Sequence, residues 1–414
     1  MVSVSSAENP FRYGAVARGP YFTDRERELE TLLPDLRGGQ DVVVVSPRRY
    51  GKTSLVERAI ETLRAEGALV AYLDLLGAPT KEELADDLAQ AFYDGLVSPV
   101  EHALDRVRTF FSHLRIAPRI TLGEEGKPQF EFLGYERGDD LNALIEGLLA
   151  LPGRVAVDGR KVVVVFDEFQ EIVSIDEGLP GQIRSAFQRQ PAVAHVYLGS
   201  KRHLMEPLFM NRAAPLYRSA KPLQLGPIEA DAFLAFLRQR FGAGGVEVDE
   251  EPLRQLLSLT GGRPYETQEL CSFAWTRARL EGRVVDLELV TRALADLLDA
   301  ESARYLAVYD RLAPSQRALL IALARDSGRV FAEEYRRRHN LGSASSMQKA
   351  LAALDKLDLV EPLENGGHAL TDIFLRLWLL RLVPREERVH LEQVRVAVGG
   401  GTLRLERIDT AVEP

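Results

Sequence analysis

The stretch that decides the fold runs from Val42 to Leu55 and reads VVVVSPRRYGKTSL. Its four valines form a short, wholly apolar, β-branched run, which is typical of a parallel strand buried on both faces. A tight loop follows, and Ser54 to Arg64 then has the apolar spacing of a helix. Strand, loop ending in Gly-Lys-Thr, and helix form the context that a phosphate-binding loop requires. We therefore predict a phosphate-binding loop here.

Each residue type in this loop has a chemical role. Gly51 lets the backbone pass close to a phosphate, while the loop N–H groups and the helix N-terminus present positive partial charge to an anion. Lys52 is expected to reach the β and γ phosphates of ATP, and the Thr53 hydroxyl is expected to bind Mg²⁺. The usual pattern opens with glycine, and Ser46 departs from it. The predicted nucleotide-binding residues are Ser46, Pro47, Arg48, Arg49, Tyr50, Gly51, Lys52, Thr53 and Ser54.

A second motif provides the acidic residues that a phosphate-binding loop needs beside it. The run Lys161 to Phe166 (KVVVVF) predicts another buried strand, and Asp-Glu-Phe-Gln-Glu follows it. An acidic residue at the carboxyl end of a neighbouring parallel strand can meet the Mg²⁺, directly or through water, and Asp167 is that candidate. Glu168 is the candidate general base that polarises the attacking water, with Glu171 next in line. Acidic residues also follow strands in ordinary turns, but the pairing with Gly-Lys-Thr favours a nucleotide hydrolase.

Two further polar residues carry alternative interpretations. Ser200 follows an expected strand at 193–198, where a hydroxyl either senses the γ-phosphate or caps a helix at 202–209. Arg218 is a candidate arginine finger, in trans or in cis, and a lone arginine is otherwise a surface or interface residue.

Two short segments flank these motifs. Arg263 and Pro264 follow a Gly-Gly turn and either lean over the nucleotide from a lid or only fix the start of a helix. Tyr21 and Phe22 either pack near an adenine ring or form a hydrophobic staple onto the helix that follows. For that helix, the N-cap is expected at Thr23 or Asp24.

Composition limits the class of protein. The chain has 414 residues, which suits two or three domains, and no apolar run approaches the length of a membrane span. The polar start, Met1 to Pro10, has no signal-peptide core. Cys271 is the only cysteine, which predicts a buried thiol and a reducing cytoplasm. The net charge of −9 argues against a surface that binds nucleic acid everywhere, although a local basic patch remains compatible.

The order of apolar patterns predicts five segments. They are an N-terminal lead at 1–20, an α/β core at 21–226, a helical lid at 227–311, a winged-helix domain at 312–384 and a tail at 385–414. A β-hairpin insertion is expected near 119–133, after helices at 81–96 and 101–114. In the winged helix, three helices precede two strands that flank Asn365-Gly366-Gly367, and Trp378 is expected to anchor the domain.

Taken together, these motifs resemble the archaeal-type ATPases, which are prokaryotic relatives of the origin-recognition AAA+ proteins and of the STAND signalling ATPases. The resemblance covers nearly the whole chain before the tail. It is carried by NPF (9–11), RE (25–26), PRRYGKT (47–53), DEFQ (167–170) and GGRP (261–264). It implies an α/β fold with a parallel-sheet ASCE P-loop NTPase core, a helical lid and a C-terminal winged helix. It also implies Mg²⁺-dependent ATP hydrolysis.

Two purposes remain open for such a protein. The first is an ATP-driven switch whose winged helix contacts DNA, and the alternative is a switch whose winged helix binds a partner protein, another subunit or its own core. The segment from Glu333 to Glu361 contains five basic and five acidic residues. It therefore carries no net positive charge that would favour contact with DNA phosphates. The start of the expected recognition helix is nevertheless polar, with Ser343, Ser345, Ser346, Gln348 and Lys349. A metabolic kinase is disfavoured because no acceptor-substrate domain is apparent.

Overall fold

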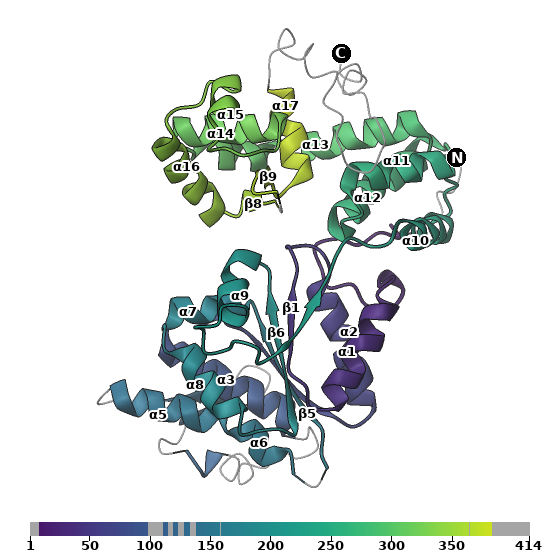
Figure 1. Cartoon of the computed structure of the whole chain (residues 1–414). Helices are drawn as coiled ribbons and strands as arrows, with labels where there is room; N and C mark the ends of the chain where they lie inside the picture. Colours follow the sequence, from purple (N-terminus) through teal and green to yellow (C-terminus); the bar gives the residue numbers. More distant parts are fainter. Residues whose placement is uncertain are drawn as a thin grey trace. The chain divides into compact units, whose positions relative to one another are not determined.

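The computed structural model divides the chain into two compact units (Figure 1). The first spans Val16–Gly226, and the second combines Met1–Ala15 with Pro227–Pro414. The residues that the structure describes are 8–97, 111–114, 119–122, 128–132, 138–157, 159–363 and 365–382.

The first unit is built on a five-stranded parallel sheet in the order β2-β5-β6-β1-β7. Its strands are β1 (Val42–Val45), β2 (Leu69–Asp74), β5 (Val162–Asp167), β6 (Val193–Gly199) and β7 (Lys221–Gln224). Both valine runs form buried strands as predicted: every residue of β5 is buried, and so are the first three residues of β1. Because β1 lies between β6 and β7, the chain leaves it at a point where the strand order reverses, which is where open α/β sheets bind ligands.

Helices cover both faces of this sheet (Figure 1). One face packs against α1 and α2, and the other packs against α3, α5, α6, α8 and α9. Their bounds are α1 (Glu26–Arg37), α2 (Lys52–Ala65), α3 (Lys81–Leu96), α5 (Gly138–Leu149), α6 (Leu151–Val155), α7 (Ile172–Ile175), α8 (Leu179–Phe187) and α9 (Arg202–Phe209). Short 3₁₀ turns occur at Gly19–Tyr21, Leu75–Gly77 and Phe169–Glu171.

The predicted insertion is present as an antiparallel pair, β3 (Arg119–Leu122) with β4 (Pro128–Glu131). The helix predicted at 101–114 lies largely outside the described residues. The N-cap prediction for α1 is wrong, because the helix begins at Glu26 and Arg25 occupies the cap position without a side-chain cap bond. Phe22 packs against the core shared by α1, α2 and the sheet, which favours the staple over an adenine contact.

The second unit joins the lid and the winged helix around one continuous apolar core. The lid contains α10 (Ala230–Ala243), α11 (Glu250–Thr260), α12 (Pro264–Glu281) and α13 (Leu287–Asp310). The winged helix contains α14 (Pro314–Arg325), α15 (Glu333–Arg338), α16 (Ala344–Lys356), β8 (Val360–Pro362), β9 (His368–Leu370) and α17 (Ile373–Arg381).

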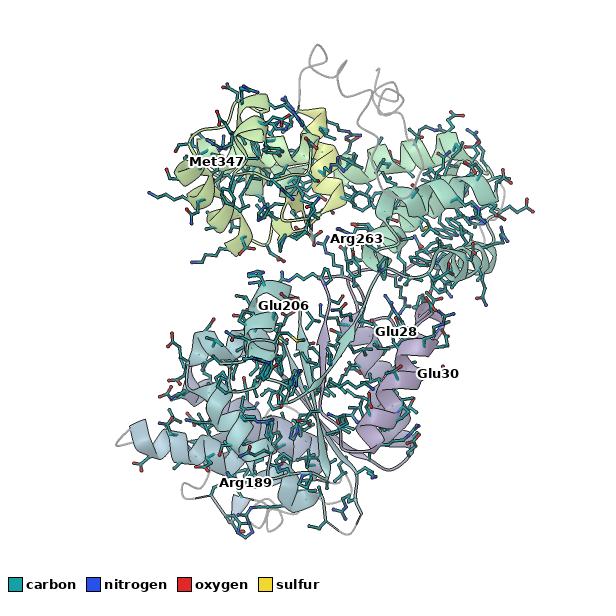
Figure 2. The ribbon with its side chains drawn as sticks, in the orientation of Figure 1. Glu28, Glu30, Arg189, Glu206, Arg263 and Met347 are labelled. Atoms are coloured by element: carbon teal, nitrogen blue, oxygen red, sulfur yellow. The ribbon has the colours of Figure 1, made fainter. Side chains whose placement is uncertain are left out.

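The long helix α13 connects the two halves of this unit. Trp378 of α17 is buried and donates its indole N–H to the Ser302 hydroxyl of α13 at 3.0 Å, so it anchors the winged helix as expected. On α12, Cys271 is fully buried, and burial raises the pKa of its thiol. Met347 points from α16 into the same core (Figure 2).

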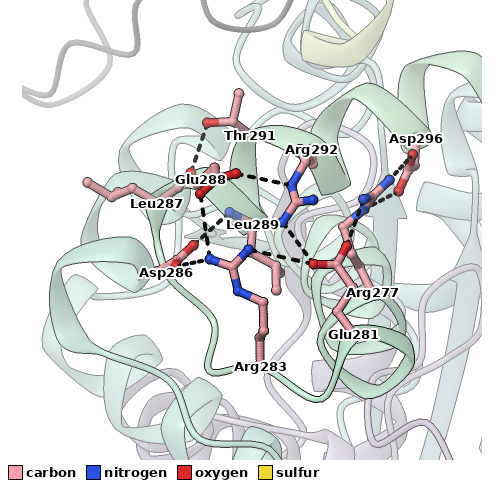
Figure 3. A network of polar contacts seen from close by, with 10 residues as sticks. All are labelled: Arg277, Glu281, Arg283, Asp286, Leu287, Glu288, Leu289, Thr291, Arg292 and Asp296. Atoms are coloured by element: carbon pink, nitrogen blue, oxygen red, sulfur yellow. Dashed lines mark hydrogen bonds and ion pairs between the residues drawn. The ribbon is translucent and has the colours of Figure 1, made fainter. Parts of the chain in front are cut away.

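An arginine-rich network ties the end of α12 to the start of α13 (Figure 3). The Glu281 carboxylate forms ion pairs with Arg277 at 2.9 Å, Arg292 at 2.8 Å and Arg283 at 3.8 Å. Arg277 also forms a two-pronged pair with Asp296, with both N–O distances at 2.7 Å. These contacts join the end of α12 to the first turns of α13, beside the apolar core that the two helices share.

The described start of the chain packs within the second unit, although it precedes the first in sequence. Asn9 donates to the Ser272 hydroxyl at 2.9 Å, and the Arg240 side chain donates to the Pro10 carbonyl at 2.8 Å. Phe11 meets Phe241 edge to face with ring centroids 4.6 Å apart. Residues 8–15 therefore belong with the lid, whereas the predicted lead segment ran to residue 20. Within the described residues, no helix combines the length and apolarity that crossing a membrane requires.

Candidate nucleotide-binding site

The loop between β1 and α2 has the backbone that its sequence predicts. Gly51 is the N-cap of α2 with φ +83°, a left-handed conformation that glycine adopts without strain. Apart from its chain neighbours, a Cβ added to Gly51 would meet no atom of the described residues within 4 Å. Backbone conformation, and not crowding by the protein, therefore requires glycine here, and the space beside it stays open to a ligand.

Ser46, which replaces the usual first glycine, fits the loop without backbone strain. It is absent from the residues with positive φ, and its backbone N–H continues the β1–β6 ladder to the Gly199 carbonyl at 3.4 Å. Its hydroxyl donates to the Pro47 carbonyl at 3.3 Å. The serine is thus accommodated as part of the loop's own hydrogen bonding.

Lys52 lies beneath the loop that it follows. The side chain is buried, and Nζ donates to the carbonyl oxygens of Ser46 at 3.0 Å and Pro47 at 3.2 Å. These two hydrogen bonds hold the Lys52 side chain against the backbone of the phosphate-binding loop. Of the neighbouring residues, Arg48 is exposed and Arg49 takes a positive φ of 68°.

The hydroxyls of Thr53 and Ser54 have different partners. Thr53 donates to Asp167 Oδ2 at 3.3 Å, so the structure brings together the two predicted Mg²⁺ ligands from α2 and β5. Ser54 instead accepts the backbone N–H of Ala17 at 3.0 Å. Within the described residues, no group of three or more His, Cys, Asp and Glu side chains is arranged to hold a metal. A hydrated Mg²⁺ suits this donor set, because the ion normally takes one or two protein ligands plus water and phosphate.

Glu168 occupies an unusual backbone conformation directly after Asp167. Its φ of +48° is left-handed, which is uncommon for a residue other than glycine and is typical of functional sites. Its Oε2 accepts hydrogen bonds from Gln170 Nε2 and from the Ser200 hydroxyl, the latter at 2.7 Å. The candidate base is therefore held by two donors from neighbouring segments.

Ser200 contacts the carboxylate of the candidate base, Glu168, and does not cap the next helix. It is buried at the end of β6, and the N-cap of α9 is Lys201, which makes no side-chain cap bond. The capping interpretation is therefore wrong. Glu171, the alternative base, lies in the 3₁₀ turn with its Oε1 4.0 Å from Lys201 Nζ.

Arg218 lies in the segment between α9 and β7. It is exposed, its φ of 53° is left-handed, and its backbone N–H donates to the Phe209 carbonyl at 3.3 Å. Its guanidinium lies over the Tyr217 ring, 5.3 Å from the centroid. An arginine finger, in trans or in cis, stays a prediction beside the surface or interface alternative.

Two contributors escaped the sequence analysis. Tyr72 of β2 donates its phenol hydroxyl to Asp167 Oδ2. Arg25 is buried with φ +99°, and its Nη2 donates to the carbonyls of Gly226 at 2.7 Å and Tyr50 at 3.3 Å. Its Nη1 pairs with Glu28 of α1 at 2.7 Å. Arg25 therefore ties the loop backbone to the last residue of the first unit.

Arg263 of the lid forms hydrogen bonds with the winged helix. Arg263 is the N-cap of α12, and Pro264 takes the first helical position, as the Gly-Gly-Arg-Pro sequence predicts (Figure 2). Both Gly261 and Gly262 have left-handed φ, at 64° and 65°. Arg263 Nη1 donates to the Thr371 carbonyl at 2.6 Å, and Nη2 pairs with Glu361 at 3.0 Å. Burial raises the pKa of the Glu361 carboxyl, although Arg263 opposes that shift.

The chain matches two family models. Residues 22–270 match a family described as an ATPase domain predominantly from Archaea, and residues 303–381 match a probable winged helix domain. An uncharacterised WD repeat-containing protein of Synechocystis is 22% identical over 309 residues. That match covers 72% of this chain but only 24% of the relative, so the chain spans about a quarter of that protein's length.

Solved structures share the fold. A Walker-type ATPase of Pyrococcus abyssi superimposes with a TM-score of 0.60 at 18% identity, covering 90% of this chain and 99% of the other. The ORC2 protein of Aeropyrum pernix, in ADPNP–ADP complexes, gives a TM-score of 0.52 at 16% identity, with 97% and 98% of the two chains covered.

Proposed function

Because the chain belongs to the family of ATPase domains found predominantly in Archaea, we propose that it binds ATP with Mg²⁺ at residues 46–54 and hydrolyses it. The observation that carries this proposal is the 3.3 Å contact between Thr53 and Asp167. A hydroxyl that follows a phosphate-binding lysine and a carboxylate at the end of a buried strand are the pair that Mg²⁺ requires in phosphoryl transfer. Both groups lie at the carboxyl edge of the sheet, beside the open space at Gly51.

Each side chain has a role in the proposed reaction. Lys52 exchanges the carbonyls of Ser46 and Pro47 for phosphate oxygens when nucleotide binds. Glu168 accepts a proton from the attacking water, and the Ser200 hydroxyl senses the γ-phosphate. Magnesium, when bound, neutralises charge that develops on the phosphates. Arg218 supplies positive charge to a neighbouring copy, if one assembles against it.

The test of nucleotide binding is Lys52→Ala, titrated with a fluorescent ATP analogue in the presence of Mg²⁺. Removing the only lysine of the loop should abolish tight binding while the circular dichroism spectrum stays unchanged. Lys161→Ala is the matched control, because Lys161 is exposed just before β5 at the opposite edge of the sheet. Equal affinities for Lys52→Ala and the control would refute the phosphate-binding assignment.

We further propose that nucleotide controls a winged helix that contacts DNA. The side chains exposed on α16 include Ser345, Gln348, Lys349 and Lys356, which can meet base edges and phosphates. Lys349→Glu should weaken binding of duplex DNA to ATP-loaded protein, and the binding should decline with salt. Arg311→Glu is the control, because it makes the same charge change at an exposed position after α13. Absence of salt-dependent binding in the unmodified protein would refute the DNA proposal.

A protein target is the second candidate. Phe331 and Leu357 leave 45% and 55% of their surface exposed in the winged helix, and exposed apolar side chains suit a protein contact. Purification of a Glu168→Gln form with and without nuclease separates the candidates. A partner retained after nuclease treatment supports the protein target, whereas one lost with the nucleic acid supports DNA.

A further inference from the structure

Tyr72 lies on the strand beside the one that carries the acidic motif. It is on β2, at the edge of the sheet, and it pairs in register with Val165 of β5. Side chains two residues apart on a strand share a face, so Tyr72, Val165 and Asp167 all point toward α2. The ring packs against the apolar core on that side and extends along the sheet toward its carboxyl edge. There the phenol hydroxyl reaches Asp167 Oδ2.

The Asp167 carboxylate is held from three directions. Its Oδ1 accepts the backbone N–H of Glu168 at 2.9 Å. Its Oδ2 accepts the hydroxyls of Thr53, at 3.3 Å, and of Tyr72. The side chain is buried, with 8% of its surface exposed, so few water molecules compete for these positions. Of the three donors, only Tyr72 comes from outside the phosphate-binding loop, its helix and the acidic motif.

The Tyr72 hydroxyl is the donor in this contact, because a carboxylate group only accepts hydrogen bonds. Partners that orient a metal-ligating carboxylate in this way commonly change metal affinity when they are removed.

We propose that Tyr72 is a positioning residue for Mg²⁺, whose hydroxyl fixes the Asp167 carboxylate in the orientation that receives the hydrated ion beside Thr53. The proposal rests on the proposed nucleotide function and deepens it. It assigns part of the metal affinity to a strand that carries neither nucleotide motif. The hydroxyl acts through Asp167 and does not itself touch the nucleotide.

Phenylalanine is the informative substitution. Tyr72 lines a hollow of about 360 Å³ at the edge of the sheet, and Asp167 is not among the residues that line it. Tyr72→Phe removes the hydroxyl and keeps the ring in place, whereas alanine would enlarge that hollow and confound the result. Tyr93→Phe is the matched control, because Tyr93 is a buried tyrosine of the same unit that packs on Phe130, away from the site.

The experiment titrates Mg²⁺ in single-turnover ATP hydrolysis by the full chain. For Tyr72→Phe, the Mg²⁺ concentration at half-maximal rate should rise about 10- to 100-fold, while the rate at saturating Mg²⁺ stays near that of the unmodified protein. ADP affinity in EDTA should not change. Binding of Mn²⁺ in the presence of ADP, followed by electron paramagnetic resonance, should weaken in parallel. Tyr93→Phe should leave all four quantities unchanged.

The outcomes separate this inference from the function on which it rests. If the unmodified chain is Mg²⁺-dependent and Tyr72→Phe behaves identically, the positioning role is refuted and the proposed function stands. Loss of ADP binding in EDTA by Tyr72→Phe also refutes it, because the tyrosine is then needed for the fold of the site. If the unmodified chain binds neither Mg²⁺-nucleotide nor Mn²⁺-nucleotide, the proposed function and this inference both fail.

Discussion

Ser200 and Glu168 meet across the carboxyl ends of two adjacent strands, with the serine hydroxyl 2.7 Å from Glu168 Oε2. Ser200 follows β6 and Glu168 follows β5, and these strands pair in parallel. Gln170 donates to the same carboxylate oxygen. The candidate base and the candidate γ-phosphate sensor are therefore in direct contact, so a phosphate that attracts the Ser200 hydroxyl would release one of the two donors on Glu168.

Replacing the base should separate binding from turnover. Glu168→Gln keeps the shape of the side chain but cannot accept a proton, so single-turnover hydrolysis should fall by roughly 10²–10⁴-fold while Mg²⁺-ATP affinity stays nearly constant. Glu171→Gln is the control, and its rate should stay within a few-fold of the unmodified protein. If Glu171→Gln loses the activity and Glu168→Gln retains it, the base is misassigned.

Arg25 should be less damaging as glycine than as alanine. Both substitutions remove the charge-assisted bonds to Tyr50 and Gly226, so the free energy of unfolding of the first unit should fall by about 2–3 kcal/mol. Glycine relieves the left-handed φ of +99°, and it should recover up to about 1 kcal/mol relative to alanine. Urea unfolding followed by circular dichroism measures both values. An alanine variant more stable than the glycine variant would contradict the strained backbone.

The pair formed by Glu361 and Arg263 predicts a pH dependence. Burial raises the pKa of Glu361 above its ordinary 4.5, so the folded state binds this proton more tightly than the unfolded state does. The resulting stability is fully present below pH 4.5 and is lost as pH rises through the folded pKa. The difference in unfolding free energy, unmodified protein minus Glu361→Gln, should therefore decrease from pH 4.5 to neutrality. Both tryptophans lie in the second unit, so fluorescence in urea reports it selectively; a difference that rises with pH would contradict this prediction.

Nucleotide binding should change the contacts that hold the winged helix against Arg263 of the lid. If Arg263 is to touch a phosphate, it must leave Glu361 and the Thr371 carbonyl, since a ligand shifts an equilibrium only through differential contacts. Hydrogen exchange of residues 343–371 should then be faster in ATP-bound Glu168→Gln protein than in its ADP-bound or nucleotide-free form. Arg263→Ala should remove the difference more than it weakens binding. Identical exchange in all three states would make the winged helix a passive appendage and refute the switch.

Sequence reasoning was most informative where function depends on neighbouring residues in the chain. The loop and the Asp-Glu pair each follow a valine-rich strand, and local pattern alone placed Thr53 and Asp167 at the same sheet edge. Tyr72 was missed because an aromatic residue in a strand is ordinary, and its role appears only when β2 is in register with β5. The sequence does hold a signal for the pairing of these two strands, because both end in aspartate. The register pairs Asp74 of β2 with Asp167 of β5.

Long-range partners explain the remaining differences. Asn9 and Ser272 are 263 residues apart in sequence, and no periodicity connects them. Arg25 adopts a backbone conformation that its residue type disfavours, so the cap of α1 was placed at Thr23 or Asp24. Likewise, α13 runs for 24 residues to Asp310, because its later turns pack against the winged helix. Tertiary contacts, and not local preference, set these features.

The shared core of the second unit makes α13 a lever arm. Its 24 residues span about 36 Å at 1.5 Å per residue, and the lid at one end and the winged helix at the other pack against it in one apolar cluster. If α13 rotated by about 5° about its lid end, its far end would move by roughly 3 Å. That displacement is about the donor–acceptor distance of a hydrogen bond. A change too small to alter packing inside either domain would thus be amplified into one large enough to make or break contacts at the winged-helix surface.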